Sequence, residues 1–268
     1  MSSPLPSPPS SRPAVGDGTP TATSAASDAR TPDGPRSALT HLGSHLRFWG
    51  VAAAGLALDL WSKDWAFRTL GQGGRRVLVP HVLELQTMMN DGALFGIGSG
   101  QTTLFLVASV LALGLVLWMF ASSSPRSWLL QVAFGSILAG AAGNMSDRLF
   151  VRLVGLPGPG GALRYFQKDV SADGQRILLR EYPGPPHNLV LERPGAEAAR
   201  LPKEVGHVRD FIKIPTRVFG KRELWPWVFN VADTLLVGGV GVLALRLWLD
   251  RRSSARGRSS LDSLPAKA

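Results

Sequence analysis

Five ionisable residues lie inside or at the ends of long apolar segments of this chain: Asp59, Lys63, Asp147, Arg148 and Asp233. A charged side chain inside a membrane costs at least about 2.5 kcal/mol on insertion scales, so such residues are rare and usually functional. If the apolar segments cross a membrane alternately, the end of the first, the end of the third and the start of the fourth emerge on one side. We therefore expect the five side chains at one level, where they would build a polar site.

Local spacing indicates how these side chains could interact. Asp59 and Lys63 are four positions apart on a helix and can pair, although a purely structural ion pair explains them equally well. Asn144 and Asp147 are three apart and share a helix face. Taken alone, the Asp-Arg dipeptide there is more typical of an interfacial anchor. Asp233 falls in the first turn of the fourth segment, where the helix dipole stabilises its charge, and could equally be a helix cap.

Four apolar segments reach the length of about 20 residues that spans a bilayer: residues 48–68, 102–121, 128–150 and 228–249. We expect a membrane α-helical protein with four transmembrane helices and a small β-rich extramembrane portion on the outer face. Residues 1–44 are rich in Ser, Pro, Thr, Ala and Gly and are expected to form a disordered tail. The four-helix domain covers 45–250, and 251–268 form a basic tail.

The extramembrane portion is predicted from two loops. Residues 77–89 contain the Val, Leu and Thr typical of strands. The second loop carries a probable β-rich insertion at 156–203, with strands expected at 163–168, 175–182 and 188–192 between Gly, Pro and Asp turns.

Composition limits the chemistry and the partners. The chain has no cysteine, which excludes disulfides, thiolate catalysis and Cys-ligated metals. Its net charge of +10 comes from basic residues in tails and loops without a nucleic-acid-binding motif, so we expect anionic membrane lipid, and no nucleic acid, as the partner. Arg47, Arg126 and the Arg cluster after Leu249 favour those ends as cytoplasmic, which places both termini in the cytoplasm.

Five separated blocks of the chain carry polar residues in a fixed order: Asp59 with Lys63, Asn-Asp-Gly-Ala-Leu-Phe-Gly at 90–96, Gly-Asn-Met-Ser-Asp-Arg at 143–148, Val-Arg-Asp-Phe-Ile at 208–212 and Phe-Asn-Val-Ala-Asp at 229–233. In these blocks and their order the chain resembles the bacterial lipoprotein signal peptidase family, also called signal peptidase II. The resemblance implies an aspartic endopeptidase of the bacterial cytoplasmic (inner) membrane, with its active site toward the outer face. It also implies prolipoprotein substrates, which are cut just before a diacylglyceryl-modified cysteine. We expect a monomer that uses no metal or cofactor.

Carried over by motif, the catalytic pair falls on Asp210 and Asp233. Two neighbouring carboxylates share one proton, so that the charged member can activate a water while the other donates to the scissile carbonyl. Further residues match family positions that line or support this site: Asn90, Asn144, Arg148 and Asn230, with Asp59 and Lys63 as a nearby support. Asp147 is the competing catalytic candidate. We assign it a structural role because an arginine follows directly and the helix end needs ordering.

The chain departs from the family pattern at two points. Asp210 lies 63 positions after Asp147, where the family has a short connection, and Leu94 replaces a usually small residue. All five blocks lie outside the insertion, so we expect most of it to be dispensable for the chemical step.

Two other functions compete with the peptidase. A small transporter or ion-conducting protein would place polar residues at mid-depth in several helices, often in inverted repeats. Here the second and third apolar segments are apolar through their centres and no internal repeat is apparent. A noncatalytic scaffold would use the polar residues only for helix packing. Such a relative would be expected to lose one of the two Asp positions, whereas this chain has both.

Overall fold

The computed structural model describes residues 37–92, 102–173, 176–184, 188–192, 201–218, 222–223 and 225–262. The predicted tail up to residue 36, Leu94 with the end of its motif block, and parts of the insertion lie outside the described residues.

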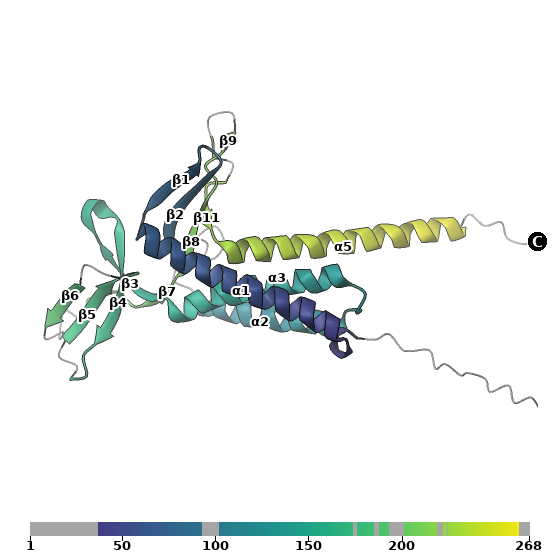
Figure 1. Ribbon diagram of the computed structural model, residues 1–268, viewed down its shortest axis with the longest axis horizontal. Coiled ribbons are helices and arrows are strands. Elements are labelled where there is room, and N and C mark those ends of the chain that lie inside the picture. The colour runs from purple at the N-terminus through teal and green to yellow at the C-terminus, as the bar shows by residue number, and fades with distance from the viewer. Residues whose placement is uncertain are drawn as a thin grey trace, which may run out of the picture. The chain divides into compact units, whose positions relative to one another are not determined.

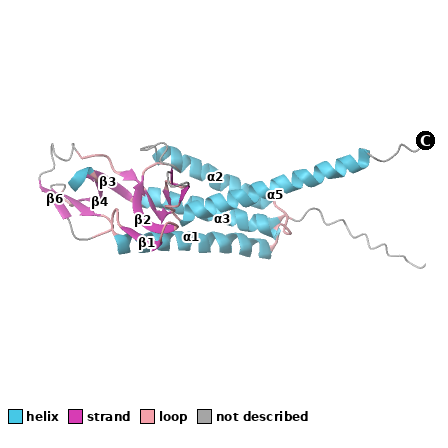
Figure 2. Cartoon of the chain, turned by 90° about the horizontal axis from the view of Figure 1, so that it is seen from above, coloured by secondary structure: helices cyan, strands magenta, loops and turns pink. Residues whose placement is uncertain are grey.

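Four long helices occupy the four predicted positions (Figures 1 and 2): α1 Leu42–Leu70, α2 Thr102–Ser122, α3 Trp128–Phe150 and α5 Val231–Asp262. Helix α1 begins inside the segment expected to be a tail, since His41 caps it by accepting a hydrogen bond from the backbone nitrogen of Ser44 at 3.2 Å. A short 3-10 helix, Ala38–Thr40, precedes it. The ordered part of the chain therefore starts earlier than the sequence indicated.

Helix α5 differs from the prediction at both ends. It begins at Val231 because Val228 and Phe229 belong to a strand. It continues to Asp262, through a segment in which we expected only a basic tail. Contacts one turn apart support the extension: Arg246 pairs with Asp250 at 3.3 Å, and the guanidinium of Arg252 lies 3.6 Å from the ring centre of Trp248.

Helix α3 lies at the centre of the helical part and packs against α1, α2 and α5. Small residues permit this close approach. A Cβ atom at Gly135 would lie 2.6 Å from the carbonyl oxygen of Phe48, and one at Gly140 would collide with the carbonyl oxygen of Ala232. The end of α3 that carries Asp147 is thereby held directly against the start of α5.

Two of the described helices are long and apolar enough to cross a membrane: Trp128–Phe150 and Val231–Arg252. Helix α2 contributes a shorter apolar run, Leu106–Ser122, and α1 carries Asp59, Lys63, Asp64 and Arg68 within its predicted span. The arrangement with four spanning helices stays a prediction.

The first sheet lies beside the end of α1 and the start of α5 (Figure 1), and its four strands run in the order β1-β2-β8-β11. These strands are β1 Arg75–Val79, β2 Leu83–Asn90, β8 Val208–Lys213 and β11 Val228–Phe229. All three pairings are antiparallel, and the β2–β8 register shifts between Leu85 and Met88. A small two-stranded sheet pairs β9 Arg217–Val218 with β10 Arg222–Glu223.

The insertion forms most of a five-stranded sheet with the order β6-β5-β4-β3-β7. Its strands are β3 Arg152–Pro157, β4 Leu163–Val170, β5 Arg176–Glu181, β6 Asn188–Glu192 and β7 Val205–Gly206, with a 3-10 helix at Pro159–Gly161. The three strands expected within the insertion are β4, β5 and β6. A small core of Phe166, Ile177 and Leu179 lies under this sheet.

Candidate active site

Asp210 is placed by strand β8, which is buried on both faces. Successive side chains of a strand alternate between its faces. Val208 and Asp210 line a cavity, whereas Phe211 points the other way into a hydrophobic cluster with Phe67 and Leu85. Packing on the apolar side therefore fixes the direction of the Asp210 carboxylate, which is 1% exposed.

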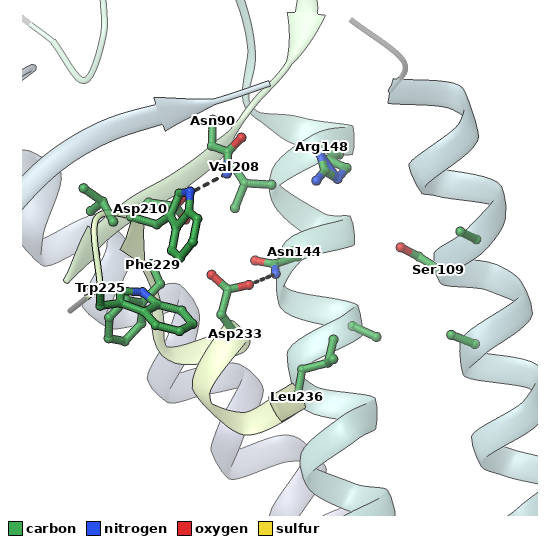
Figure 3. Close-up of a pocket in the computed structure, with 15 residues that line it drawn as sticks. Asn90, Ser109, Asn144, Arg148, Val208, Asp210, Trp225, Phe229, Asp233 and Leu236 are labelled. Carbon is green, nitrogen blue, oxygen red and sulfur yellow. Dashed lines mark hydrogen bonds between the residues drawn. The ribbon is translucent and has the colours of Figure 1, made fainter. Parts of the chain in front are cut away.

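Asp233 is placed by the start of α5, two residues after the helix begins. Its backbone nitrogen donates to Oδ1 of Asn230 at 2.9 Å, and its own Oδ2 accepts from the backbone nitrogen of Asn230 at 3.2 Å. This reciprocal arrangement is that of a capping box, with Asn and Asp in place of the usual Ser/Thr and Glu. Its Oδ1 accepts a further bond from Nδ2 of Asn144 at 2.8 Å (Figure 3).

Two asparagine side chains connect the two aspartates, and a third contacts Asp210 alone. Nδ2 of Asn230 donates to Oδ1 of Asp210 at 2.7 Å and to Oδ1 of Asn144 at 3.1 Å. Nδ2 of Asn90, at the end of β2, donates to Oδ2 of Asp210 at 3.0 Å (Figure 3). Residues from β2, α3, β8 and the turn before α5 thus meet in one hydrogen-bonded cluster.

Lys63 supports this cluster from α1. Its Nζ lies 2.7 Å from Oδ2 of Asp59 and 3.4 Å from Oδ2 of Asp147, and it donates to Oδ1 of Asn144 at 3.1 Å. Asp59 and Lys63 are both fully buried. A Cβ atom at Gly143 would collide with the Asp59 carboxylate, so the glycine lets this carboxylate lie directly against α3. The structure therefore brings together the ionisable residues expected at one level.

The hydrogen bonds of Asp147 go to Arg209, not to the Arg148 that follows it in sequence. The backbone nitrogen, Nε and Nη2 of Arg209 donate to the Asp147 carboxylate at 3.0, 3.1 and 2.7 Å. Arg148 instead donates through Nη2 to the carbonyl oxygen of Gly92 at 2.7 Å. Asp147 thus holds strand β8, whereas Arg148 holds the backbone just after strand β2.

A cavity of about 330 Å³ opens beside the two aspartates (Figure 3). Its polar lining consists of Asn90, Ser109, Asn144, Arg148, Asp210 and Asp233. Its apolar and aromatic lining consists of Ala108, Ala112, Ala141, Val208, Trp225, Trp227, Val228, Phe229 and Leu236. Four sequence-predicted residues lie outside this lining. Lys63 and Asn230 contact it through hydrogen bonds to Asn144 and Asp210. Asp59 and Asp147 accept hydrogen bonds from Ala232 and Arg209, each of which directly precedes a lining aspartate in sequence.

Electrostatics favour a proton on the pair. Burial, reinforced by the negative charge of Asp233, raises the pKa of Asp210 to about 8, although Asn90 and Asn230 act against the shift by donating to the carboxylate. Burial lowers the pKa of His207, three positions before Asp210. These surroundings are suited to a carboxyl group that exchanges protons near neutral pH.

Sequence reasoning missed Arg209 and two tryptophans of the cavity lining. Arg209 occupies the variable position of the Val-x-Asp-Phe block, and a cation directly before a buried strand aspartate was the available signal. The structure places Trp225 and Trp227, which directly precede the last strand of the first sheet, on the wall of the cavity.

Comparisons with known proteins agree with this geometry. The family model described as "Signal peptidase (SPase) II" matches residues 51–249. The lipoprotein signal peptidase of Rhodopirellula baltica is 41% identical over 106 residues, which cover 38% of this chain and 48% of that protein. The one from Leifsonia xyli is 27% identical over 73% of this chain and 63% of its own length. The chain thus spans about half to two thirds of these two relatives.

A more distant relative and a solved structure match over more of their lengths. The lipoprotein signal peptidase of Desulfitobacterium hafniense is 23% identical, with 74% of this chain and 93% of that protein covered. A solved structure described as a bacterial membrane enzyme, determined by the in meso method, has a TM-score of 0.50 at 22% identity. It covers 81% of this chain and 92% of its own, and it supports the fold alone. Because the family model extends over most of the chain, the chain belongs to the signal peptidase II family.

Proposed function

We propose that this chain is an aspartic endopeptidase that removes the signal peptide from bacterial prolipoproteins by cleaving before the diacylglyceryl-modified cysteine. One observation carries the proposal: Asp210 and Asp233, from a strand and a helix, line the same cavity and share the side chain or backbone of Asn230 as a hydrogen-bond partner. The residues of the family's catalytic motifs therefore meet in space.

The chemistry follows from one proton shared by the pair. The charged carboxylate takes a proton from a water molecule, whose oxygen forms a bond to the scissile carbonyl carbon. The other carboxyl group gives its proton to the carbonyl oxygen. In the second step one hydroxyl of the resulting diol gives its proton to the carboxylate that had protonated the carbonyl oxygen. The other carboxyl group gives its proton to the amide nitrogen, and the carbon–nitrogen bond breaks. The pair titrates as a unit, so its two roles belong to the dyad.

The remaining lining residues bind and orient the substrate. Asn90, Asn144 and Asn230 fix both carboxylates, and Arg148, fixed to the carbonyl of Gly92, brings a positive charge into the cavity lining. Such preorganised groups stabilise charge that develops at the carbonyl oxygen. Asp59, Lys63 and Asp147 keep their supporting role behind the lining.

The apolar side of the cavity fits a peptide that arrives from a membrane. Ala108 and Ala112 of α2 face Ala141 of α3 and Leu236 of α5 across it. The three alanines leave room for a backbone, and the apolar character of all four side chains matches the hydrophobic end of a signal peptide. The partners proposed are a prolipoprotein bearing the diacylglyceryl cysteine and the surrounding membrane lipid, with the protein acting as a monomer.

The proposed setting is the bacterial cytoplasmic membrane, crossed by α1, α2, α3 and α5. Both termini would lie in the cytoplasm, and the two larger sheets and the cavity toward the outer face. The short connection between α2 and α3, at residues 123–127, supports an antiparallel pair of spans.

The test is cleavage in vitro. The purified protein in lipid bicelles is incubated with a diacylglyceryl prolipoprotein, and mass spectrometry identifies the products. We expect one new N-terminus at the lipidated cysteine and no cleavage of the same substrate without its diacylglyceryl group. Cleavage at another bond, or none with the lipidated substrate, would contradict the proposal.

A further inference from the structure

Arg209 ties strand β8 to the end of helix α3. Its backbone nitrogen and two guanidinium nitrogens all donate to the Asp147 carboxylate, and both residues are buried. Asp210 follows Arg209 directly and points to the other face of the strand. The position of Arg209 along α3 therefore sets the position of Asp210 relative to Asp233.

Tyr182 completes the surroundings of this guanidinium. Its hydroxyl accepts a hydrogen bond from Nη1 of Arg209 at 3.3 Å. Tyr182 follows strand β5 and so belongs to the insertion. Its ring lies against Phe67 of α1, with ring centres 6.2 Å apart, and packs on the hydrophobic cluster that contains Phe211. Packing on these elements fixes the hydroxyl beside Arg209.

Gln72, in the turn after α1, holds the backbone around Tyr182. Its Nε2 donates to the carbonyl oxygens of Tyr165, at 2.7 Å, and of Tyr182, and its Oε1 accepts from the backbone nitrogen of Tyr165 at 2.9 Å. The backbone nitrogen of Tyr182 donates to the Tyr165 carbonyl at 3.0 Å. The Gln72 side-chain amide thus pairs with backbone groups of β4 and of the residue after β5, as a neighbouring strand would.

We infer that Tyr182 is a positioning residue for the catalytic pair, acting through Arg209 and Asp147, so that the insertion forms part of the frame of the active site. The inference rests on the proposed function. It also narrows the expectation that the insertion is dispensable: the segments around Tyr165 and Tyr182 are required, and the expectation holds only for parts farther from this junction. A guanidinium that loses a partner in a buried site is held less firmly, because its remaining donors no longer restrict it to one orientation.

The chain offers a matched control for removing this hydroxyl. It has two tyrosines, and the other, Tyr165, lies at the same junction with its ring against His207. Within the described part of the chain, the Tyr165 hydroxyl has no hydrogen-bond partner. Tyr182→Phe and Tyr165→Phe therefore remove the same atom, but only the first removes a contact with Arg209.

The two variants and Arg209→Lys are compared in kcat and KM for a diacylglyceryl lipopeptide. We expect Tyr182→Phe to lower kcat by about tenfold with KM within about twofold, since the lipid and peptide contacts remain. Tyr165→Phe should stay within about twofold of the wild type in both constants. Arg209→Lys keeps the charge but not the planar fork, and should lower kcat by about 100-fold.

Amide hydrogen exchange adds a measurement that does not depend on activity. The backbone nitrogen of Arg209 donates to Asp147, so its exchange should be faster in Tyr182→Phe than in Tyr165→Phe. If the wild type cleaves and Tyr182→Phe equals Tyr165→Phe in kcat, the positioning role is overturned while the proposed function stands. If the wild type does not cleave, the proposed function fails. In that case, unchanged exchange at Arg209 in Tyr182→Phe overturns the inference as well. Faster exchange in that variant supports the Tyr182–Arg209 contact as the one that orders β8.

Discussion

Oδ1 of Asp59 accepts a hydrogen bond from the backbone nitrogen of Ala232 at 2.8 Å, so a side chain of α1 caps the helix that carries Asp233. The first backbone N–H groups of a helix lack partners within the helix. Asp59 supplies one such partner, and the same carboxylate pairs with Lys63. The capping contact thus fixes the start of α5 against α1 and links it to the buried charges.

The first prediction concerns this double role of Asp59. Asp59→Ala should lower the free energy of unfolding by about 3–5 kcal/mol, because it leaves Lys63 without its closest partner in a buried site. Asp59→Asn keeps an acceptor for the Ala232 nitrogen and should destabilise clearly less. Thermal unfolding of both variants in the same detergent shows which of them is less stable. Equal destabilisation would show that the cap contributes nothing.

Asn230 provides a second prediction, since its side chain has two separable functions. Asn230→Ser keeps an oxygen that can cap Asp233, but loses the donation to Asp210. Asn230→Ala loses both. We expect Ser to retain about 1 kcal/mol of stability that Ala loses, while both variants cleave the lipopeptide poorly. Normal cleavage by Asn230→Ser would remove Asn230 from the active site.

The third prediction is a pH dependence of stability. The pKa of Asp210 is raised from its ordinary value of 3.8 to about 8, mainly by burial. The folded state therefore holds this proton more tightly than the unfolded chain, and the stability that the protonated group contributes is fully present below pH 3.8 and is lost as pH rises toward 8. Asp210→Asn resembles the protonated form at every pH, so its melting temperature should exceed that of the wild type by a margin that grows between these pH values.

A suitable control for this experiment is Asp169→Asn, which changes an aspartate whose side chain is 56% exposed. Its melting temperature should follow the wild type across the same pH range. A margin for Asp210→Asn that stays constant or shrinks with rising pH would contradict the buried, proton-holding state of Asp210.

The fourth prediction is topological. Reporter fusions at the C-terminus should be active in the cytoplasm, and fusions within 160–200 should be active only outside it. The arginines of the short α2–α3 connection and of the chain ends set this orientation, because loops longer than about 60 residues translocate largely regardless of their charge. Reporters in the α2–α3 connection at residues 123–127 should behave like those at the C-terminus. A cytoplasmic insertion would exclude an active site at the outer face.

The sequence predicted the elements well where a local pattern sets them. The apolar length of α3 gave residues 128–150, and the turn residues of the insertion gave β4, β5 and β6. The predicted ends of α5 were wrong. A cap at Asn230 decides where the helix begins, and contacts such as that of Arg252 with Trp248 extend it beyond the apolar segment. These contacts outweigh the composition on which the prediction was based.

Contacts between distant residues explain what the sequence left open in the site. The motif blocks located Asp210 and Asp233, yet no pattern indicated that Asp147 would be bound by Arg209, 62 positions away, or that Gln72 would hold Tyr182, 110 positions away. Such pairs depend on how helices and sheets pack together. Gln72 and Tyr182 also lie outside the family blocks, since Tyr182 belongs to the insertion.

The central claim is that Asp210 and Asp233 act together as the catalytic pair, and lipopeptide cleavage by three single Asp→Asn variants tests it most directly. Asp210→Asn and Asp233→Asn should each abolish cleavage while the protein still accumulates in the membrane, and the double variant should be no worse, since the two residues act as a unit. Asp147→Asn should retain measurable cleavage, because the single amide oxygen can still accept the two guanidinium hydrogen bonds of Arg209. Substantial activity in Asp210→Asn or Asp233→Asn, or loss of chemistry in a folded Asp147→Asn alone, would contradict the account.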